Sequence, residues 1–163
     1  MPGMWQNHYY CGVNQMNLKK LIGALAMTFC ALGAHPADLK MYKAEIRAAA
    51  KEYKIEPAHL LAIAEIESNF NPKAAGDKKH GVYRSHGMFQ IRVKLHDITI
   101  DQARDVRWAA RWACRYLIKR GYRKDAHGAL TAYNGAGKRA ARYCKKVLKA
   151  AEKYRKKNEK GGK

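Results

Sequence analysis

The stretch LLAIAEIESNFN, residues 60–71, decides how the rest of this chain is organised. At 100° per residue its apolar side chains fall on one broad face of a helix, which predicts a helix packed into a core. Glu65 projects to the opposite side beside Asn69, where we expect a solvated carboxylate. The apolar face consists of Leu60, Ile63, Ala64, Ile66 and Phe70.

Glu67 is the second glutamate of this helix, and its position is unusual. It lies three and four residues after Ala64 and Ile63, near the middle of the apolar face. Desolvation disfavours a charged carboxyl, so Glu67 must find partners or take up a proton. A carboxylic acid protonated near neutral pH is what a general acid needs. The alternative is a glutamate that caps the helix or forms a salt bridge at its end, and the helix alone favours neither.

Length and charge narrow the possible classes of protein. The 163 residues suit one domain with small appendages, and 47% hydrophobic residues permit a modest core. The formal net charge of +20 is very high for this length and indicates a polyanionic partner or surface. Nucleic acid, anionic membrane and bacterial cell wall all qualify.

An apolar run near the N-terminus is typical of a secretory signal peptide. Two lysines precede LIGALAMTFCALGA, residues 21–34, and small residues follow it. The run is shorter than the roughly 20 residues of a membrane span, and a buried core helix is the alternative. We expect a signal peptide over 16–37, cleaved after Ala34 or Ala37. The protein would then be exported to the periplasm or cell envelope, with no membrane span left after cleavage.

Residues 1–15 do not fit the start of a signal peptide. They carry no acidic or basic side chain apart from His8, whereas signal peptides begin with a charged region. Met16 therefore looks like the natural start, and 1–15 like a non-native or dispensable extension. Residues up to Ala37 contain two lysines and no acidic residue, so the basicity belongs to the remaining domain.

Removal of these segments also takes away Cys11 and Cys30, which leaves Cys114 and Cys144. Two cysteines in an exported protein suggest a disulfide that joins two helices. Two free buried thiols are the alternative, because spacing cannot establish disulfide geometry.

The remaining chain has mainly helical periodicity and no internal repeat, so the expected class is mainly α. The stretch 73–86 is rich in Gly, Lys and His and is expected to form a long loop or small hairpin. Its His80 and His86 are expected to be solvated, because no further metal ligands lie nearby, and we expect no metal and no cofactor. The expected helices begin at Asp38 and Pro57, and later cover 101–120, 126–133 and 138–154, before a basic flexible tail over 155–163.

Three segments in order resemble the soluble lytic transglycosylase (SLT) domain of the lysozyme-like superfamily. They are ESNFNPKAAG (67–76), HGMFQI (86–91) and AYNGA (132–136). That family has a Glu-Ser pair that ends a helix, then a Gly-apolar-apolar-Gln-Ile turn, then an Ala-Tyr-Asn turn. RYCKKVL (142–148) is similar to its closing segment, where a tyrosine approaches the catalytic glutamate. The resemblance implies one lysozyme-like domain over 38–154, with the loop or hairpin beside an active-site cleft.

The resemblance also implies a reaction. The family cleaves the β-1,4 bond between N-acetylmuramic acid and N-acetylglucosamine in peptidoglycan, and closes a 1,6-anhydro ring on the muramic acid. It implies Glu67 as the single general acid/base. Tyr143 would hydrogen-bond Glu67, and Phe89 is expected to pack inside. The other residues that it implies at the substrate site are Ser68, Gly87, Met88, Gln90, Tyr133 and Asn134, although Gln90 or Asn134 could bond only loop backbone and either tyrosine could be core.

A related group keeps a second reaction open. Animal-type lysozymes share the Glu-Ser pair and the turn but hydrolyse the glycan, with a second carboxylate two residues before the glycine. Ser85 occupies that position here. Most glycosidases need two carboxylates roughly 5–10 Å apart, so its absence favours the lyase. Asp77 keeps an inverting muramidase open, although a turn aspartate is its simpler interpretation.

The charge also permits two functions without catalysis. One is a basic nucleic-acid-binding domain, and the other is a cationic protein that disrupts membranes. The signal peptide and the lack of a nucleic-acid motif argue against specific nucleic-acid binding. The expected partner is the glycan strand of peptidoglycan, which a monomer would cleave for a secretion, conjugation or pilus machine, or for a phage.

Overall fold

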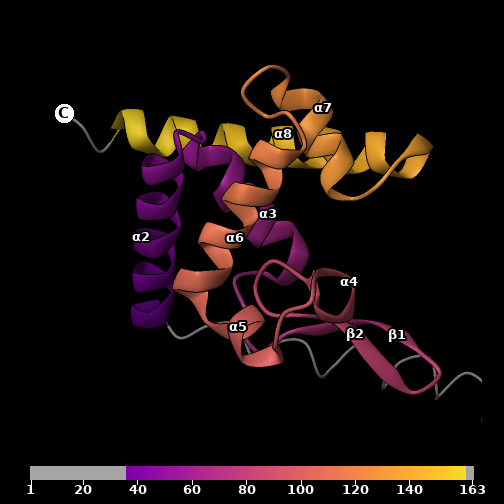
Figure 1. The fold of residues 1–163 in the computed structure, drawn as a ribbon. Helices are drawn as coiled ribbons and strands as arrows, with labels where there is room; N and C mark the ends of the chain where they lie inside the picture. The colour runs from indigo at the N-terminus through magenta and orange to yellow at the C-terminus, as the bar shows by residue number, and fades with distance from the viewer. Residues whose placement is uncertain (1–35, 161–163) are drawn as a thin grey trace, which may run out of the picture. The chain divides into compact units, whose positions relative to one another are not determined.

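The computed structural model describes residues 36–160. The expected extension over 1–15, the expected signal peptide as far as residue 35, and Cys11 and Cys30 lie outside the described residues. In chain order the elements are α2 (Pro36–Tyr53), α3 (Pro57–Ser68), β1 (Ala75–Lys79), β2 (Val82–His86), β3 (Ile91–Arg92), α4 (Val93–His96), α5 (Ile100–Arg104), α6 (Val106–Lys119), α7 (Ala126–Tyr133) and α8 (Gly137–Lys160) (Figure 1).

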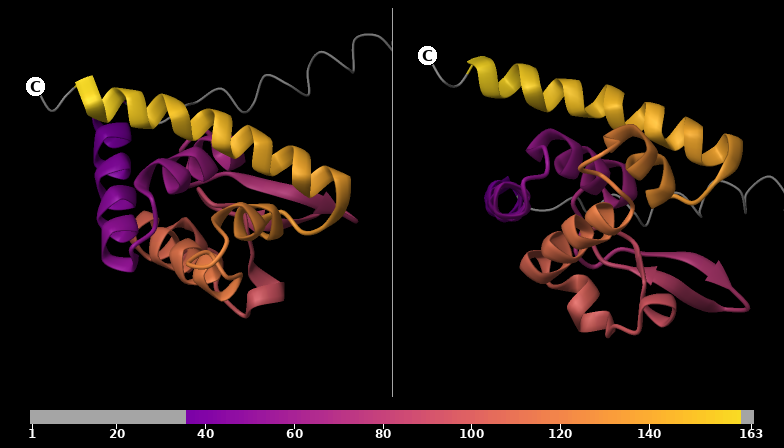
Figure 2. Two further views of the ribbon diagram at one scale, coloured as in Figure 1. Left: turned by 90° about the horizontal axis from the view of Figure 1, so that it is seen from above. Right: turned by 45° about the horizontal axis from the view of Figure 1, so that its top comes forward.

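Helix α3 lies at the centre of the described helices. It packs against α2, α6 and α8, and α8 lies across α3 and α7 as a long rod (Figures 1 and 2). Every side chain from Ala58 to Ala64 is buried, so the expected single apolar face is wrong for this part of the helix. Neighbouring helices cover α3 on all sides there, which sequence periodicity cannot reveal. Each large apolar side chain buried in this way stabilises the fold by roughly 1.5–3 kcal/mol.

The end of α3 agrees with a prediction from the sequence, in which Asn71 precedes Pro72 and residues before a proline avoid the α-helical conformation. The helix ends at Ser68, and Asn69 caps it in the left-handed conformation, with φ 51°. Phe70 also has a positive φ of 62° and is buried, so it joins the core from beyond the helix. These two residues turn the chain sharply at the point where the helix leaves the core.

The stretch expected to be a loop or hairpin is a hairpin. Strands β1 and β2 pair antiparallel with Ala75 opposite His86, and the two-residue β3 extends the sheet in the order β1-β2-β3. The first half of the hairpin projects into solvent. His86 lies at its inner end and is only 6% exposed, so the expectation that it is solvated is wrong, whereas His80 is exposed as expected.

The single helix expected over 101–120 is in fact two helices, α5 and α6. They are separated by Asp105, whose backbone is extended with ψ 115°. Its side chain accepts a hydrogen bond from the backbone N–H of Trp108 at 2.6 Å and so caps the second helix. The prediction failed because aspartate can serve as an N-cap as easily as it can sit on a wet helix face.

The last helix is longer than expected. Helix α8 continues to Lys160, so residues 155–160 are helical and not part of a flexible tail. The Arg155 guanidinium holds this end against the domain through an ion pair with Glu56, which the local sequence could not predict. At the other end of the described chain, Asp38 lies within the first turn of α2 and does not cap it, because that helix begins at Pro36.

The described domain is mainly α, with one small three-stranded sheet, as expected for a lysozyme-like SLT domain. Helix α7 has the expected bounds, and the Asp125 carboxylate caps it by accepting the Gly128 N–H at 2.9 Å. Among the described residues, no helix combines the length and the apolar character needed to cross a membrane.

Candidate active site

Glu67 lies in the last turn of α3, where that helix leaves the core. Its side chain is partly buried. The hydroxyl of Tyr143, which is buried on α8, donates a hydrogen bond to Glu67 Oε1 at 2.7 Å. Among the described residues, none forms an ion pair with Glu67. The carboxyl is therefore held by one neutral donor and by no counter-charge.

Burial raises the pKa of Glu67 above the ordinary value of a glutamate. The Tyr143 hydrogen bond acts in the opposite direction, because it favours the charged carboxylate, but its effect on the pKa is the smaller one. Glu67 thus keeps its proton to a higher pH than an ordinary glutamate. It neither caps the helix nor forms a salt bridge in the described chain, so the general-acid interpretation is the one that its surroundings support.

Ser68 connects the end of α3 to the turn that follows β2. Its hydroxyl donates to the carbonyl of Met88 at 2.9 Å and accepts the N–H of Asn71 at 3.1 Å. Met88 is fully buried. Ser68 therefore fixes the turn relative to the segment that carries Glu67, while no hydrogen bond joins its side chain to Glu67 itself in the described residues.

The turn Gly87–Gln90 is held from inside. Gly87 has a positive φ of 75°, and a Cβ atom there would lie 1.7 Å from the carbonyl oxygen of Ala103, so only glycine fits. Gln90 also has a positive φ, 48°, and its Nε2 donates to the carbonyl of Gly87 at 3.0 Å. Phe89 is 1% exposed, which agrees with the expected packing role.

Tyr133 joins α7 to this turn. Its hydroxyl donates to the carbonyl of Phe89 at 3.0 Å, and its ring stacks on that of Tyr143 with centroids 6.3 Å apart. Burial raises the pKa of both tyrosines, so both stay protonated and can donate. The chain thus brings α3, the turn, α7 and α8 together around Glu67.

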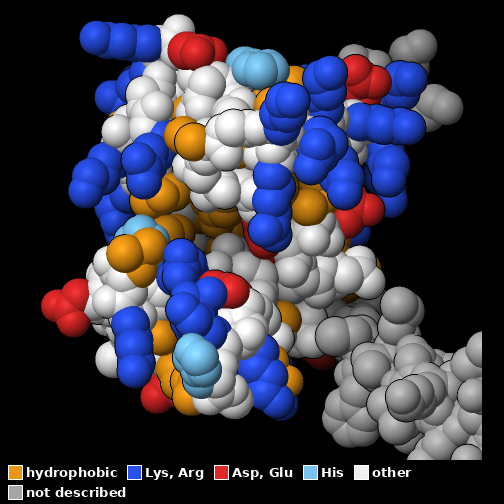
Figure 3. All heavy atoms as spheres, turned by 90° about the vertical axis from the view of Figure 1, so that its right-hand side faces the viewer, with side chains coloured by type: hydrophobic (Ala, Val, Ile, Leu, Met, Phe, Trp, Pro, Cys, Tyr) orange, Lys and Arg blue, Asp and Glu red, His pale blue; other side chains and the backbone are white. Residues whose placement is uncertain are grey.

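These elements line a cleft of about 890 Å³. Five of the expected site residues line this one cavity: Glu67, Asp77, Gln90, Tyr133 and Asn134. The face that carries the hairpin and the N-terminal part of α8 is hollowed between an upper and a lower part, with Lys and Arg side chains on both rims (Figure 3). Gly87, Met88 and Ser68 support the cleft from behind and do not line it.

Other residues that line the cleft were not found from the sequence. Trp112 and Tyr116 stack with centroids 4.9 Å apart and form an aromatic wall. Their spacing of four residues on a helix was a usable signal. Four arginines also line the cleft, but nothing distinguished them from the many other basic residues; they are Arg84, Arg92, Arg120 and Arg139.

Asp77, the possible second carboxylate, lines the same cleft as Glu67. Its Oδ1 lies 2.7 Å from Nη2 of Arg84, and its Oδ2 lies 3.5 Å from Nε of Arg92. The hydrogen bond from Arg84 holds the pKa of Asp77 below its usual range, and the charges of both arginines act in the same direction. Asp77 is therefore an exposed carboxylate whose charge two arginines balance.

The structure does not contain the disulfide that we expected between Cys114 and Cys144. Both cysteines are free and buried. Cys114 is on α6, whereas the main neighbours of α8 are α3 and α7. The thiol of Cys144 donates instead to the carbonyl of His127 on α7 at 3.5 Å. Burial raises the pKa of the Cys114 thiol to about 12, so it is an unreactive core residue.

No three His, Cys, Asp or Glu side chains gather into a metal-binding group in the part of the chain that the structure describes. His86 is buried, and its Nε2 lies 3.2 Å from the carbonyl of Tyr83 on the same strand. The cleft itself contains acid–base and hydrogen-bonding groups, the aromatic wall of Trp112 and Tyr116, and arginine side chains.

Comparison with known proteins agrees with this geometry. The family model described as "Transglycosylase SLT domain" matches residues 44–156, which is more than half of the chain. The match spans Glu67, the hairpin, the turn and Tyr143. No curated protein matches the sequence.

Proposed function

Because this chain belongs to the transglycosylase SLT domain family of the lysozyme-like superfamily, we propose that it is a peptidoglycan lytic transglycosylase with Glu67 as its single general acid/base. Membership of the family implies an enzyme that cleaves glycan in peptidoglycan. The observation that carries the finer proposal is the state of Glu67: a desolvated carboxyl in a wide cleft, which accepts a hydrogen bond from the Tyr143 hydroxyl and has no ion-pair partner among the described residues.

The proposed reaction uses Glu67 twice. As an acid, Glu67 gives its proton to the glycosidic oxygen while the bond from that oxygen to C1 of N-acetylmuramic acid breaks. As a base, the resulting carboxylate takes the proton from the C6 hydroxyl of the same sugar, and O6 bonds to C1. The product is a 1,6-anhydro-muramic end. No water is consumed, and Glu67 ends the cycle protonated, as it began.

The raised pKa of Glu67 suits the first step, because the acid must be protonated when substrate binds. Tyr143 suits the second step. Its hydrogen bond stabilises the carboxylate that exists between the two proton transfers, and its own raised pKa keeps its proton in place. Burial therefore favours the protonated form of Glu67, and Tyr143 stabilises its ionised form, so both forms that the reaction needs are supported.

We propose supporting roles for the other residues at the cleft. Gln90 and the backbone of its turn would shape the sugar site, and Tyr133 and Asn134 would line it. Ser68 and Met88 would hold that turn at a fixed distance from Glu67 through their hydrogen bond, and Gly87 would let the turn pack closely. Trp112 and Tyr116 would offer aromatic faces to sugar rings.

A muramidase that uses Glu67 with Asp77 is the second candidate, because Asp77 lines the same cleft. Its two arginine partners favour the lyase. A general base must be free to take a proton from water, and the ion pairs with Arg84 and Arg92 make Asp77 a weaker base.

Mass spectrometry of the soluble products from purified peptidoglycan tests the proposal. We expect the wild-type protein to release anhydro-muropeptides and the Glu67→Gln variant to release them about 10³-fold more slowly. Hydrated reducing ends would contradict the lytic transglycosylase and support the muramidase. Cleavage by Glu67→Gln at the wild-type rate would remove Glu67 from the mechanism. The matched control is Glu65→Gln, which changes the other glutamate of the same helix and is expected to remain active.

The place of action follows from the substrate. A peptidoglycan-cleaving enzyme acts outside the cytoplasm, and we propose export to the periplasm or cell envelope. We also propose that it opens the wall locally for a secretion, conjugation or phage machine. Fractionation of the native host, with the protein detected by antibody, tests export; a cytoplasmic pool alone would contradict it.

A further inference from the structure

A second pocket of about 320 Å³ adjoins the cleft at the N-terminal part of α8. Asn134 and Arg139 line both cavities, so the second pocket opens beside the first. Tyr143 also lines it and donates to Glu67, which places the pocket next to the proposed acid. The remaining lining residues are Ile66, Arg142 and Lys146.

Three cations of this pocket come from one face of α8. Arg139, Arg142 and Lys146 follow each other at spacings of three and four residues, and all are exposed. Like charges at these spacings destabilise a helix, so the arrangement has a cost to stability. Of the described residues that line the pocket, none is acidic.

These three cations differ from several other arginines, which have an acidic partner. Arg107, Arg111 and Arg155 each form an ion pair with a glutamate. By contrast, none of the three pocket cations has an ion-pair partner within the described chain. They lie in the first three turns of a long helix, on the part of that helix that lines the pocket. The described residues of the pocket thus supply three positive charges and no negative charge to balance them, which suits an anionic ligand.

We propose that this pocket binds a carboxylate of the peptide stem that the muramic acid at Glu67 carries. The inference rests on the proposed function and adds a subsite for the peptide. The stem is the anionic part of the substrate, because the sugar backbone carries no charge while the stem is attached. A stem that leaves the cleft past Asn134 and Arg139 enters the pocket, where Arg142 and Lys146 meet its carboxylates.

Soluble, uncross-linked glycan chains free of wall polymers test this proposal, because phosphate from such polymers could fill the same pocket. One portion keeps its stem carboxylates, and the other has them converted to amides with carbodiimide and ammonia. We expect the wild-type protein to release anhydro products from both, with a lower KM for the carboxylate form. In the double variant R142A/K146A that preference falls roughly five- to tenfold, the range that two partly exposed ion pairs provide.

The matched control is K145A/K149A, which removes the same charge from exposed residues of the same helix that do not line the pocket. It is expected to keep the wild-type preference. Equal loss in both double variants would mean general attraction between a basic protein and an acidic polymer, and would overturn the subsite, as would an unchanged preference in R142A/K146A. No cleavage of either chain by the wild-type protein would instead overturn the proposed function. If wall polymer phosphate is the true ligand, adding purified polymer inhibits the wild type but not R142A/K146A, while amidation of the stems changes nothing.

Discussion

The two ends of α3 carry the same residue in opposite situations. Glu56 precedes the helix and meets a full positive charge, because the Arg155 guanidinium binds both of its carboxylate oxygens. Glu67 ends the helix, and its side-chain partner among the described residues is the neutral hydroxyl of Tyr143. The pKa of Glu56 is lowered, chiefly by its hydrogen bond with Arg155, whereas burial raises the pKa of Glu67. The presence of one cation at Glu56, with none paired to Glu67 in the described chain, thus accompanies the opposite pKa shifts of the two glutamates.

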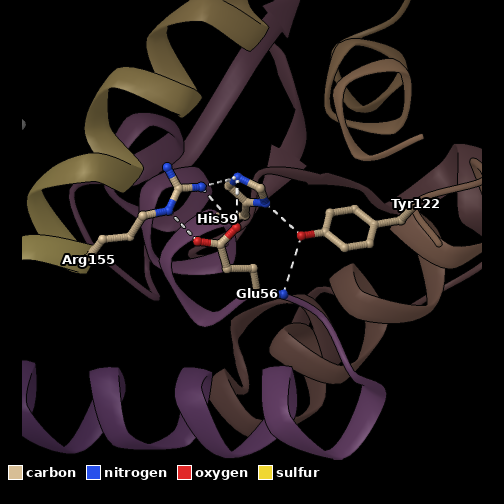
Figure 4. Close-up of polar contacts among 4 residues, drawn as sticks. All are labelled: Glu56, His59, Tyr122 and Arg155. Atoms are coloured by element: carbon tan, nitrogen blue, oxygen red, sulfur yellow. Dashed lines mark hydrogen bonds and ion pairs between the residues drawn. The ribbon is translucent and has the colours of Figure 1, made fainter. Parts of the chain in front are cut away.

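A small network surrounds Glu56 (Figure 4). His59 Nε2 lies 3.0 Å from Nη2 of Arg155, and His59 Nδ1 lies 2.6 Å from the hydroxyl of Tyr122. The same hydroxyl accepts the backbone N–H of Glu56 at 3.3 Å. This network joins the start of α3, the loop after α6 and the distal part of α8, while Tyr143 near the start of α8 contacts the other end of α3. Helix α8 therefore provides a hydrogen-bond donor to each glutamate, Tyr143 to Glu67 and Arg155 to Glu56.

The largest expected effect comes from Glu67→Gln, which removes the acid and keeps the shape. We expect the rate of glycan cleavage to fall by about 10³-fold, within the range typical of general acid–base catalysis.

The folded domain of the Glu67→Gln variant should be more stable than the wild type, because glutamine has no buried charge. At pH 7.5 we expect the melting temperature to rise by roughly 2–4 °C.

The pH dependence of this gain has a definite sign. The pKa of Glu67 is raised in the folded state, so its ionisation costs stability as pH rises through that pKa. Below the pKa of the unfolded chain the cost is absent. The melting temperatures of wild type and Glu67→Gln should therefore coincide near pH 4 and diverge at higher pH. A constant difference across this range would contradict the assignment.

Tyr143→Phe sharpens the comparison by removing the hydroxyl that donates a hydrogen bond to Glu67. We expect kcat to fall roughly tenfold, which corresponds to about 1.4 kcal/mol, because the carboxylate between the two proton transfers loses its hydrogen bond. The same loss raises the pKa of Glu67 further. The alkaline limb of the pH profile of kcat/KM should then move to higher pH. A fall in rate without this displacement would mean that Tyr143 is only a packing residue.

Glu56→Gln removes the ion pair with Arg155 at the start of α3. We expect the free energy of unfolding to fall by about 1 kcal/mol, a modest value because water screens a partly exposed pair. The loss should appear at neutral pH and shrink in acid, since the lowered pKa of Glu56 stabilises the fold above the unfolded pKa and not below it. Chemical denaturation at pH 7 and pH 4 measures both values, and glycan cleavage should stay within twofold of wild type.

The smallest expected effect is that of Asp77→Asn. If one carboxylate suffices, the rate of anhydro product release stays within about twofold, because Asp77 serves only its ion pairs with Arg84 and Arg92. A loss comparable to that of Glu67→Gln would show that the cleft uses two carboxylates, and would favour the muramidase.

The sequence predicted those features that depend on local chemistry. The end of α3 followed from a proline, the hairpin from a glycine-rich stretch, and the unusual position of Glu67 from helical spacing. The order of the motifs predicted the family and its fold. Each of these signals lies within a run of a few residues, so it can be recognised in the sequence without knowing the tertiary contacts.

The features that were missed depend on residues far apart in the chain. Glu65 was expected to be solvated, yet the hydroxyl of Tyr154 donates to its Oε2 at 2.9 Å and Lys153 lies 3.7 Å from its Oε1. The extension of α8 depends on the pair between Arg155 and Glu56. The break at Asp105 and the free cysteines likewise reflect packing, which spacing along the chain does not encode.

The close contact behind Gly87 has a consequence for how this cleft can change. A substitution there moves the turn away from α5, and the turn carries the carbonyls that Ser68 and Tyr133 bind. One added methyl group would therefore disturb three walls of the cleft at once. Side chains on the rims can change independently of this turn, so we expect substitutions that alter substrate choice to be tolerated there. A library that diversifies the hairpin tip and the exposed face of α8 while it keeps Gly87 should retain far more folded members than one that includes it.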